Sequence, residues 1–188
     1  MRAARKAVSV HGSGMDHGFT LVELMLVVTV VGILSSIAVP AVLRARATSW
    51  EASTIGSLRA LNAAEAAYAT GCGGGYYAPS VATLATVPAG GKNPFIGPGF
   101  TADTIDREGY QLVFTASATG PLSPASCNGV AAGQGVVSYF FGGNPTTTGL
   151  GAPARYFGTS ITGTIFQSSI RVPNFFTGSP AAPATAIQ

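Results

Sequence analysis

The sequence predicts an α+β protein in which one long N-terminal helix packs on a small antiparallel β-sheet. Residues 19–43 form an apolar run, which continues as an amphipathic pattern to about residue 70. Most of the 25 glycines and 12 prolines of the 188-residue chain follow Thr70, between short segments that alternate apolar and polar side chains. That pattern is typical of short strands joined by turns.

Composition and charge exclude several function classes for the part of the chain that begins at Phe19. The net charge is +3, but Arg2, Arg5 and Lys6 precede Phe19, so the remainder is nearly neutral and has no basic stripe for nucleic acid. Both histidines also precede Phe19. A chain cut there lacks the residue needed for Ser-His-Asp or Cys-His catalysis and for metal sites that use histidine. We therefore expect a protein that is not an enzyme.

Residues 1–18 are basic at the start and then polar, as in a leader peptide. The apolar run behind them is longer than the 7–15 apolar residues of an ordinary secretory signal, and it contains Glu23. A lone carboxylate costs roughly 2.5–3.5 kcal/mol in the middle of a membrane helix and by default marks a functional site. Met15 is an alternative start to Met1 and would leave a shorter leader.

The segment Gly18–Glu23, with the sequence GFTLVE, resembles the processing and methylation motif of type IV pilins and type II secretion pseudopilins. The pattern comprises a Gly–Phe junction, a glutamate four residues after Phe19, and an apolar helix with Pro40 near its end. The resemblance implies that a prepilin peptidase cuts between Gly18 and Phe19, and that Phe19 becomes the N-methylated terminus. The aspartate and histidine just before Gly18 stand where family members commonly have a basic residue.

Glu23 has a physical role in this interpretation. Cleavage creates an amine at Phe19 in the same apolar layer as the Glu23 carboxylate, and the two charges can neutralise each other. Because Glu23 lies one helical turn further along, we expect its partner to be the amine of a neighbouring subunit. The pair would then fix the axial register between subunits. The alternative is a protonated Glu23 that faces lipid.

We expect the helix to extend from about Phe19 to about Thr70, with a weak region between Gly32 and Pro40. Pro40 removes an intrahelical hydrogen bond and clashes with the preceding turn. The sequence leaves open a kink or local melting, as in assembled filaments of the family, and a helix that continues through Pro40. We favour the second form for an isolated subunit.

After Leu43, apolar side chains recur at helical spacing and predict a face that packs on the sheet: Trp50, Ile55, Leu58, Leu61 and Tyr68. The charged residues of this half are expected on the remaining, polar face: Arg44, Arg46, Glu51, Arg59 and Glu65. Arg44 and Arg46 either contact anionic lipid headgroups or a neighbour's acid, or they belong to a solvated face.

The part of the chain after residue 43 is called the head, and beyond the long helix it is expected to contain short elements. Glycines around Cys72 end the helix, a short helix opens near Ser80, and another helical turn covers residues 101–108. The strand candidates are residues 110–115, 136–141, 154–159 and 163–167, with a turn at 142–145. The simplest topology is an antiparallel meander on the long helix, with aromatic side chains facing that helix.

Cys72 and Cys127 are interpreted as a disulfide, because a pair of cysteines in a domain outside the cytoplasm is usually bridged. Two free buried thiols are the alternative. Some pseudopilins bind calcium in a loop between strands, and Asp103, Asp106 and Glu108 are oxygen ligands that would suit such a site. A solvated or helix-capping role is the favoured interpretation of these acids, and no other metal or cofactor is expected.

The chain therefore divides into a leader (1–18), a transmembrane and filament-core helix (19–43), a head that includes the second half of the long helix (44–177), and a disordered tail (178–188). The resemblance implies a structural subunit of a type IV pilus or pilus-like filament, for adhesion, motility or DNA uptake. A type II secretion pseudopilin that acts in protein export is the alternative, and a membrane-anchored exported binding domain is a further one.

The resemblance also implies partners and a location. The partners are copies of the chain, other pilins or pseudopilins, the prepilin peptidase, an assembly ATPase and an inner-membrane platform protein. The location is the bacterial inner membrane, crossed once with the head outside the cytoplasm, followed by an extracellular or periplasmic filament.

Overall fold

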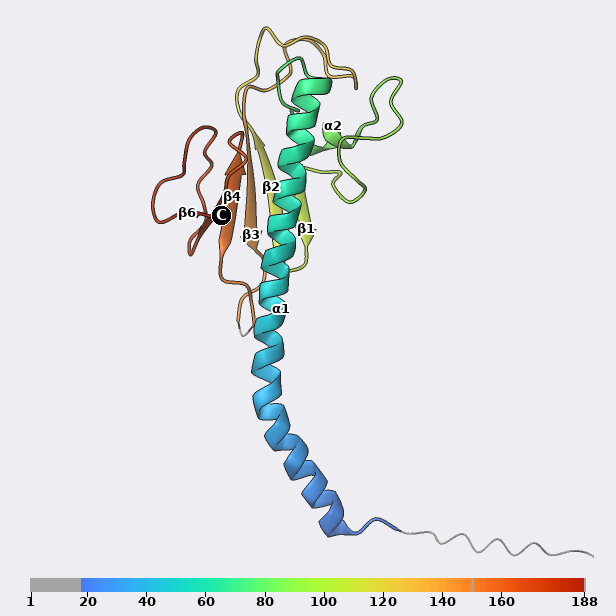
Figure 1. Ribbon diagram of the computed structural model, residues 1–188, viewed down its shortest axis with the longest axis vertical. Coiled ribbons are helices and arrows are strands. Elements are labelled where there is room, and N and C mark those ends of the chain that lie inside the picture. The colour runs from blue at the N-terminus through green and yellow to red at the C-terminus, as the bar shows by residue number, and fades with distance from the viewer. Residues whose placement is uncertain (1–17, 150, 188) are drawn as a thin grey trace, which may run out of the picture. The chain divides into compact units, whose positions relative to one another are not determined.

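The structure is a computed structural model that describes residues 18–149 and 151–187. The expected leader lies outside these residues, apart from Gly18. The architecture is the expected one, a long N-terminal helix followed by a six-stranded antiparallel sheet (Figure 1). Contacts divide the chain into two compact units that meet between Val39 and Pro40, inside the long helix.

The long helix, α1, extends over Leu21–Gly71 and comprises 51 residues. It is continuous through Gly32 and Pro40, which is the form favoured above for an isolated subunit. Its end is made by the glycine-rich segment, as predicted. The backbone N–H groups of Cys72 and Gly73 both donate to the carbonyl of Tyr68, at 2.8 Å each. Two glycines with positive φ, at 60° and 92°, then turn the chain back.

A short helix, α2, covers Val81–Ala85 and confirms the helix predicted near Ser80. The backbone N–H of Thr83 donates to Oγ of Ser80, at 3.2 Å, which is the usual bond of an N-cap. The N–H of Val81 donates to Oδ1 of Asp103, at 2.8 Å. Asp103 therefore satisfies a second free donor at the start of α2.

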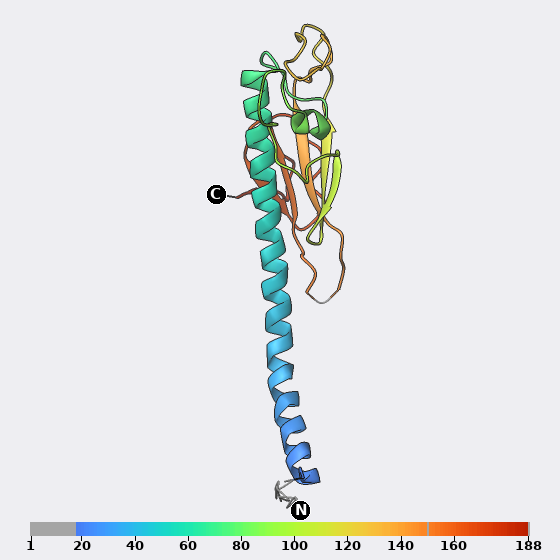
Figure 2. The same cartoon turned by 90° about the vertical axis from the view of Figure 1, so that its right-hand side faces the viewer.

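Six strands follow and pair in the order of the sequence, each antiparallel to the next, so the predicted meander is confirmed. Figure 2 shows the second half of α1 lying along one face of this sheet. The strands are β1 (Thr104–Arg107), β2 (Tyr110–Ala116), β3 (Tyr139–Pro145), β4 (Tyr156–Ser160), β5 (Ile165–Ser168) and β6 (Thr185–Ala186).

The turn predicted at residues 142–145 is wrong, because these residues form the second half of β3. Strand β3 accordingly begins three residues later than predicted, at Tyr139. The glycines serve close packing instead of a turn. A Cβ on Gly143 would lie 2.9 Å from the methyl carbon of Thr54 in α1, and one on Gly142 would lie 3.1 Å from the ring of Phe140. A side chain at Gly143 would force α1 away from the sheet, whereas one at Gly142 would require the Phe140 ring to shift.

The helical turn predicted over residues 101–108 is also wrong, because Thr104–Arg107 forms β1. A two-residue turn joins it to β2, and both residues have positive φ, 46° at Glu108 and 76° at Gly109. Two such residues are typical of a type I′ hairpin turn, in which asparagine or aspartate usually takes the first place. Because Glu108 stands at that place, the sequence lacks the usual signal of such a turn, and the hairpin was not predicted.

The expectation of a disordered tail over residues 178–188 is wrong for its last described residues. Thr185–Ala186 forms β6, which pairs with Phe166 and Gln167 of β5. The backbone N–H of Ile187 also donates to the carbonyl of Ile165, at 2.8 Å. The C-terminal segment therefore closes one edge of the sheet.

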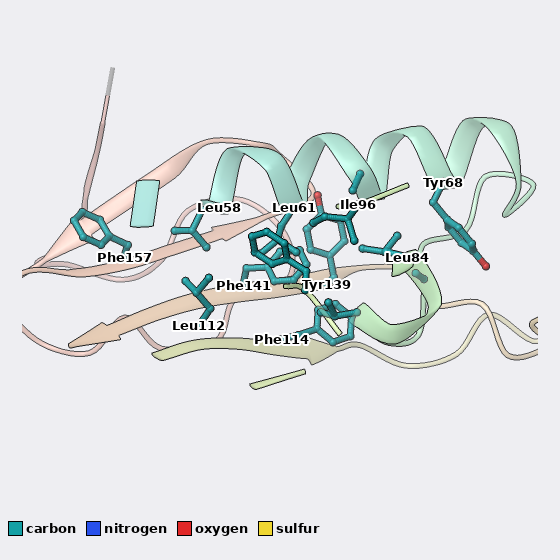
Figure 3. Packing of buried hydrophobic residues seen from close by; sticks show 14 of the residues in the cluster. Leu58, Leu61, Tyr68, Leu84, Ile96, Leu112, Phe114, Tyr139, Phe141 and Phe157 are labelled. Atoms are coloured by element: carbon teal, nitrogen blue, oxygen red, sulfur yellow. The ribbon is translucent and has the colours of Figure 1, made fainter. Parts of the chain in front are cut away.

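The main core lies between α1 and the sheet, where the predicted helix face meets aromatic side chains of the strands (Figure 3). Leu58, Leu61 and Tyr68 are at most 1% exposed, which confirms the predicted contact face. The opposing strand residues are Leu112, Phe114, Tyr139, Phe141 and Phe157. The neighbouring residue Phe140 belongs to a second, smaller cluster with Phe166, Val172 and Phe175, since successive strand residues point to opposite faces.

The prediction that Glu51 lies on the exposed polar face of the helix is wrong. Glu51 is buried and pairs with Arg155, whose Nε donates to Oε2 of Glu51 at 2.8 Å and whose Nη2 also contacts that oxygen. The hydrogen bond with Glu51 is the main cause that raises the pKa of the Arg155 guanidinium. The pair joins α1 to the residue just before β4, over a separation of 104 residues in the chain.

Glu65 is the second exception to the predicted polar face, since it is 0% exposed. Its Oε2 accepts a hydrogen bond from the backbone N–H of Ala78, at 2.9 Å, while its Oε1 has no partner among the described residues. Burial raises the pKa of the Glu65 carboxyl to about 8, and the bond from Ala78 lowers it by less. Glu65 therefore holds a proton at neutral pH. The segment that follows the end of α1 and contains Ala78 lies against it.

Glu65 makes the stability of the head depend on pH. The carboxyl loses its proton near pH 4.5 when unfolded and near pH 8 when folded, so the unfolded state binds fewer protons between these values. The contribution of Glu65 to the free energy of unfolding is therefore fully present below about pH 4.5. It decreases as the pH rises to about 8, by on the order of 5 kcal/mol in total. The measurement is urea unfolding of the detergent-solubilised chain across this range, followed by near-UV circular dichroism.

The matched variant is Glu65→Gln, which keeps an oxygen for the Ala78 N–H and cannot titrate. We expect the decrease between pH 4.5 and 8 to disappear in this variant. The neighbouring hydroxyls of Tyr68 and Tyr139 do not contribute, because burial raises their pKa values further above 10. An unchanged slope in Glu65→Gln would assign the effect to another group.

Candidate functional site

The predicted cleavage junction lies in exposed backbone just before α1. Gly18, Phe19 and Thr20 have no regular secondary structure, and Phe19 is 81% exposed. Apart from Gly18 itself and its chain neighbours, no atom of the described residues lies within 4 Å of the position that a Cβ on Gly18 would occupy. The Gly18–Phe19 peptide bond is therefore outside the helix and open to an approaching protein.

Thr20 fixes where the helix begins. Its Oγ1 accepts a hydrogen bond from the backbone N–H of Glu23, at 3.2 Å, and its carbonyl accepts from the N–H of Leu24, also at 3.2 Å. Threonine at the N-cap and glutamate three residues later is the spacing of a capping box. The sequence analysis missed this role of Thr20, although the spacing would have indicated it. The cap keeps the two residues of the junction out of the helix.

Glu23 is exposed within an apolar surface. Arg155 and Glu51 form the only ion pair among residues 18–149 and 151–187, so Glu23 has no cationic partner there. The surface around it is made by Phe19 and the large apolar residues of the first half of α1. These residues are about half to four-fifths exposed: Phe19, Leu21, Val22, Leu24, Met25, Leu26, Val27, Val28, Val30, Val31, Ile33, Leu34, Ile37, Val39 and Val42. This stretch is long and apolar enough to cross a membrane.

The segment between Gly32 and Pro40 holds its helical form with one hydrogen bond fewer. Pro40 has no N–H to offer to the carbonyl of Ser36, four residues earlier. The hydroxyl of Ser36 donates to the carbonyl of Ile33, at 2.7 Å, so it is satisfied within its own helix. A Cβ on Gly32 would meet no atom within 4 Å. The boundary between the two compact units falls at the end of this segment, between Val39 and Pro40.

The calcium candidates Asp103, Asp106 and Glu108 do not come together as a metal site. Asp103 caps α2, and Oδ1 of Asp106 accepts from Nε2 of Gln111, at 3.2 Å. Glu108 lies in the turn between β1 and β2. Within the described part of the chain, no group of three His, Cys, Asp or Glu residues is placed to hold a metal ion.

The structure joins Cys72 and Cys127 by a disulfide with a sequence separation of 55 residues. Its surroundings tie three segments together. The carbonyl of Cys127 accepts from the N–H of Ala89, at 2.9 Å, and Nδ2 of Asn128 donates to the carbonyl of Thr83 in α2, at 2.7 Å. The bridge thus holds the loop before β3 against the end of α1 and against α2.

Removing this bridge should destabilise the head. In the chain-entropy model, a loop of this length contributes about 4 kcal/mol, so Cys72→Ser should lower the free energy of unfolding by about that amount. Urea unfolding of the detergent-solubilised chain measures it, and non-reducing electrophoresis reports the bridge. The control is the same chain treated with reductant, which should match Cys72→Ser. If reductant changed neither mobility nor stability, the cysteines would not be bridged.

Comparison with known families agrees with the arrangement at the N-terminal end of α1. The family model for the prokaryotic N-terminal methylation motif matches residues 14–39, which include the junction, Glu23 and most of the exposed apolar surface. Neither the curated proteins nor the solved structures include a match to the chain. Residues 14–39 are thus the prepilin motif of type IV pilins and pseudopilins.

Proposed function

We propose that the chain is a structural, non-catalytic subunit of a type IV pilus or pilus-like filament. The observation that carries the proposal is the exposed apolar half of α1, which follows directly on the capped Gly18–Phe19 junction. An apolar surface of this extent is unfavourable in water and requires lipid or other apolar helices around it. A subunit that first lies in a bilayer and then packs among copies of itself meets that requirement at both stages.

Glu23 supplies the selectivity that apolar packing lacks. Lipid tails are as apolar as leucine, so moving α1 from lipid to a bundle of helices yields little from the hydrophobic effect. A carboxylate within an apolar layer is costly by itself, and a cation beside it reduces that cost. We assign the cation to the Phe19 amine of a neighbouring subunit, which is released by cleavage after Gly18. Cleavage is then a condition for assembly.

The proposed domain roles follow from this scheme. Residues 1–18 are the leader, 19–43 the membrane anchor and later filament core, 44–177 the head, and 178–188 a C-terminal tail that contains β6. The head lies outside the cytoplasm, where a disulfide is stable. The work of extraction from the bilayer is assigned to an assembly ATPase and an inner-membrane platform protein, and processing and N-methylation to the prepilin peptidase.

A type II secretion pseudopilin is the alternative assignment for the same N-terminal segment. The separation of Asp103, Asp106 and Glu108 supports the pilus assignment, because these acids offer no calcium loop of the kind that some pseudopilins have. Neighbouring genes distinguish the two systems. A retraction ATPase gene supports a pilus, whereas a secretin gene with several pseudopilin genes supports secretion.

Gly18→Ala should leave the precursor uncut in the membrane. Among the described residues, the added methyl group has no neighbour within 4 Å beyond the adjoining residues of the chain, so we expect the fold to be unaffected and the change to act on recognition by the peptidase. The intact mass of the wild-type chain should show loss of residues 1–18 and gain of one methyl group. The variant should keep its full mass.

Gly32→Ala is the matched control, because Gly32 also lacks neighbours within 4 Å but lies away from the junction. It should be cut normally. A wild-type chain that keeps residues 1–18, or is cut after Ala41, would contradict the proposed processing and support an anchored exported domain.

Glu23→Val should be cut and inserted like the wild type but should assemble poorly, because the Phe19 amines would have no carboxylate in the apolar layer. Shearing and electron microscopy of surface filaments measure the result, with at least a tenfold decrease expected, equivalent to about 1.4 kcal/mol per contact. Thr29→Val is the control, since the Thr29 hydroxyl donates to its own helix at the carbonyl of Leu26. Normal filaments from Glu23→Val would rule out the register role.

A further inference from the structure

A small pocket lies where α1 leaves its apolar stretch. Three side chains of α1 form one wall, and residues 147–148 and 151–152, between β3 and β4, form the other. The volume is about 130 Å³. The lining residues are Leu43, Arg46, Trp50, Thr147, Thr148, Gly151 and Ala152.

Close contacts hold the two walls of this pocket together. A Cβ on Gly151 would lie 2.8 Å from Cβ of Leu43, so only glycine permits the approach. The backbone N–H of Thr146 donates to the carbonyl of Gly109, at 2.9 Å, and a Cβ on Gly109 would lie 2.7 Å from the Trp50 ring. The turn at Gly109 therefore braces both the tryptophan and the segment that carries the two threonines.

The lining of the pocket suits an anion. The Arg46 guanidinium lies over the Trp50 ring, 5.4 Å from its centroid, and has no carboxylate partner among the described residues. None of the described residues that line the pocket is acidic. Thr147 and Thr148 add two hydroxyl groups that can donate hydrogen bonds. A guanidinium with hydroxyl donors is a suitable site for phosphate oxygens.

The position of the pocket along α1 indicates which phosphate-containing molecule it would meet. Arg46 follows Leu43, the last residue of the apolar run, by three residues, which is about 5 Å of helix. The headgroup layer on each side of the hydrocarbon core is of similar thickness, about 5–8 Å. Tryptophan is also enriched at this depth, and Arg44 adds a second exposed cation.

We propose that this pocket binds the phosphate of an anionic phospholipid headgroup while the subunit resides in the membrane. The inference rests on the proposed function in one respect, namely that residues 19–43 span the bilayer. The bound headgroup positions the base of the head on the membrane surface. It must be released when the subunit leaves the bilayer, so it favours the membrane-resident state over the filament.

Trp50 is the only tryptophan of the chain, so tryptophan fluorescence comes from a residue that lines this pocket. The full-length protein is placed in nanodiscs of phosphatidylcholine, with rising mole fractions of phosphatidylglycerol. Insertion is checked separately by protection of residues 19–43 from protease. We expect Trp50 emission to change saturably with phosphatidylglycerol. Inorganic phosphate added to phosphatidylcholine nanodiscs should produce no such change, which separates a lipid headgroup from free phosphate.

Two variants test the contacts. Arg46→Gln should require about fivefold more phosphatidylglycerol for the half-maximal change, the value for one basic residue near an anionic surface. Thr148→Val should weaken the response in the same direction. Arg59→Gln is the matched control, since Arg59 is an exposed arginine of α1 that does not line the pocket. It should respond like the wild type.

The results separate this inference from the proposed function. A chain that does not insert overturns both the membrane stage and the headgroup site. An inserted chain with equal Trp50 emission in both lipids overturns the headgroup site alone. A response that instead follows protein density in phosphatidylcholine nanodiscs would assign the change to contact with a second copy of the chain and would also overturn the headgroup site.

Discussion

The head depends on the contact between the second half of α1 and the sheet. Leu58 and Leu61 reach the aromatic side chains of β3, and this contact is close because Gly143 offers no side chain opposite Thr54. Polar groups fix the same contact in register. Nδ2 of Asn62 donates to Oγ1 of Thr159, at 2.8 Å, and Arg155 pairs with Glu51. One helix thus organises a folded domain by its second half while its first half stays apolar and exposed.

The two buried carboxylates of α1 differ in how burial is tolerated. Glu51 is paired with the Arg155 guanidinium, and breaking such a pair leaves an uncompensated buried charge. Glu65 has one backbone donor and no cation, so it holds a proton instead. Glu23, in the exposed apolar half, also lacks a cation beside it among the described residues. The solution proposed for Glu23 lies in a second subunit, and cleavage of the first eighteen residues makes it available.

The features that could be predicted from the sequence have strong local signals. The apolar run, the Gly18–Phe19 motif and the leucine spacing of α1 were sufficient for the helix, the motif and the core face. The burial of Glu51 and Glu65 could not be predicted, because it depends on Arg155 and Ala78, which lie outside α1 in loop segments 104 and 13 residues further along the chain. Gly142 and Gly143 misled the prediction, since the same residues that permit turns also permit close packing in a strand.

The order of the strands has a consequence for how the head is made. Each strand of the sheet pairs with the one before it in the sequence, from β1 to β6. A chain exported from its N-terminal end onward would present each strand to a partner that has already emerged. Pairings between sequence neighbours form quickly and leave few edges open for aggregation during export. The sheet can therefore form on the emerged helix by adding one strand after another, and β6 is added last.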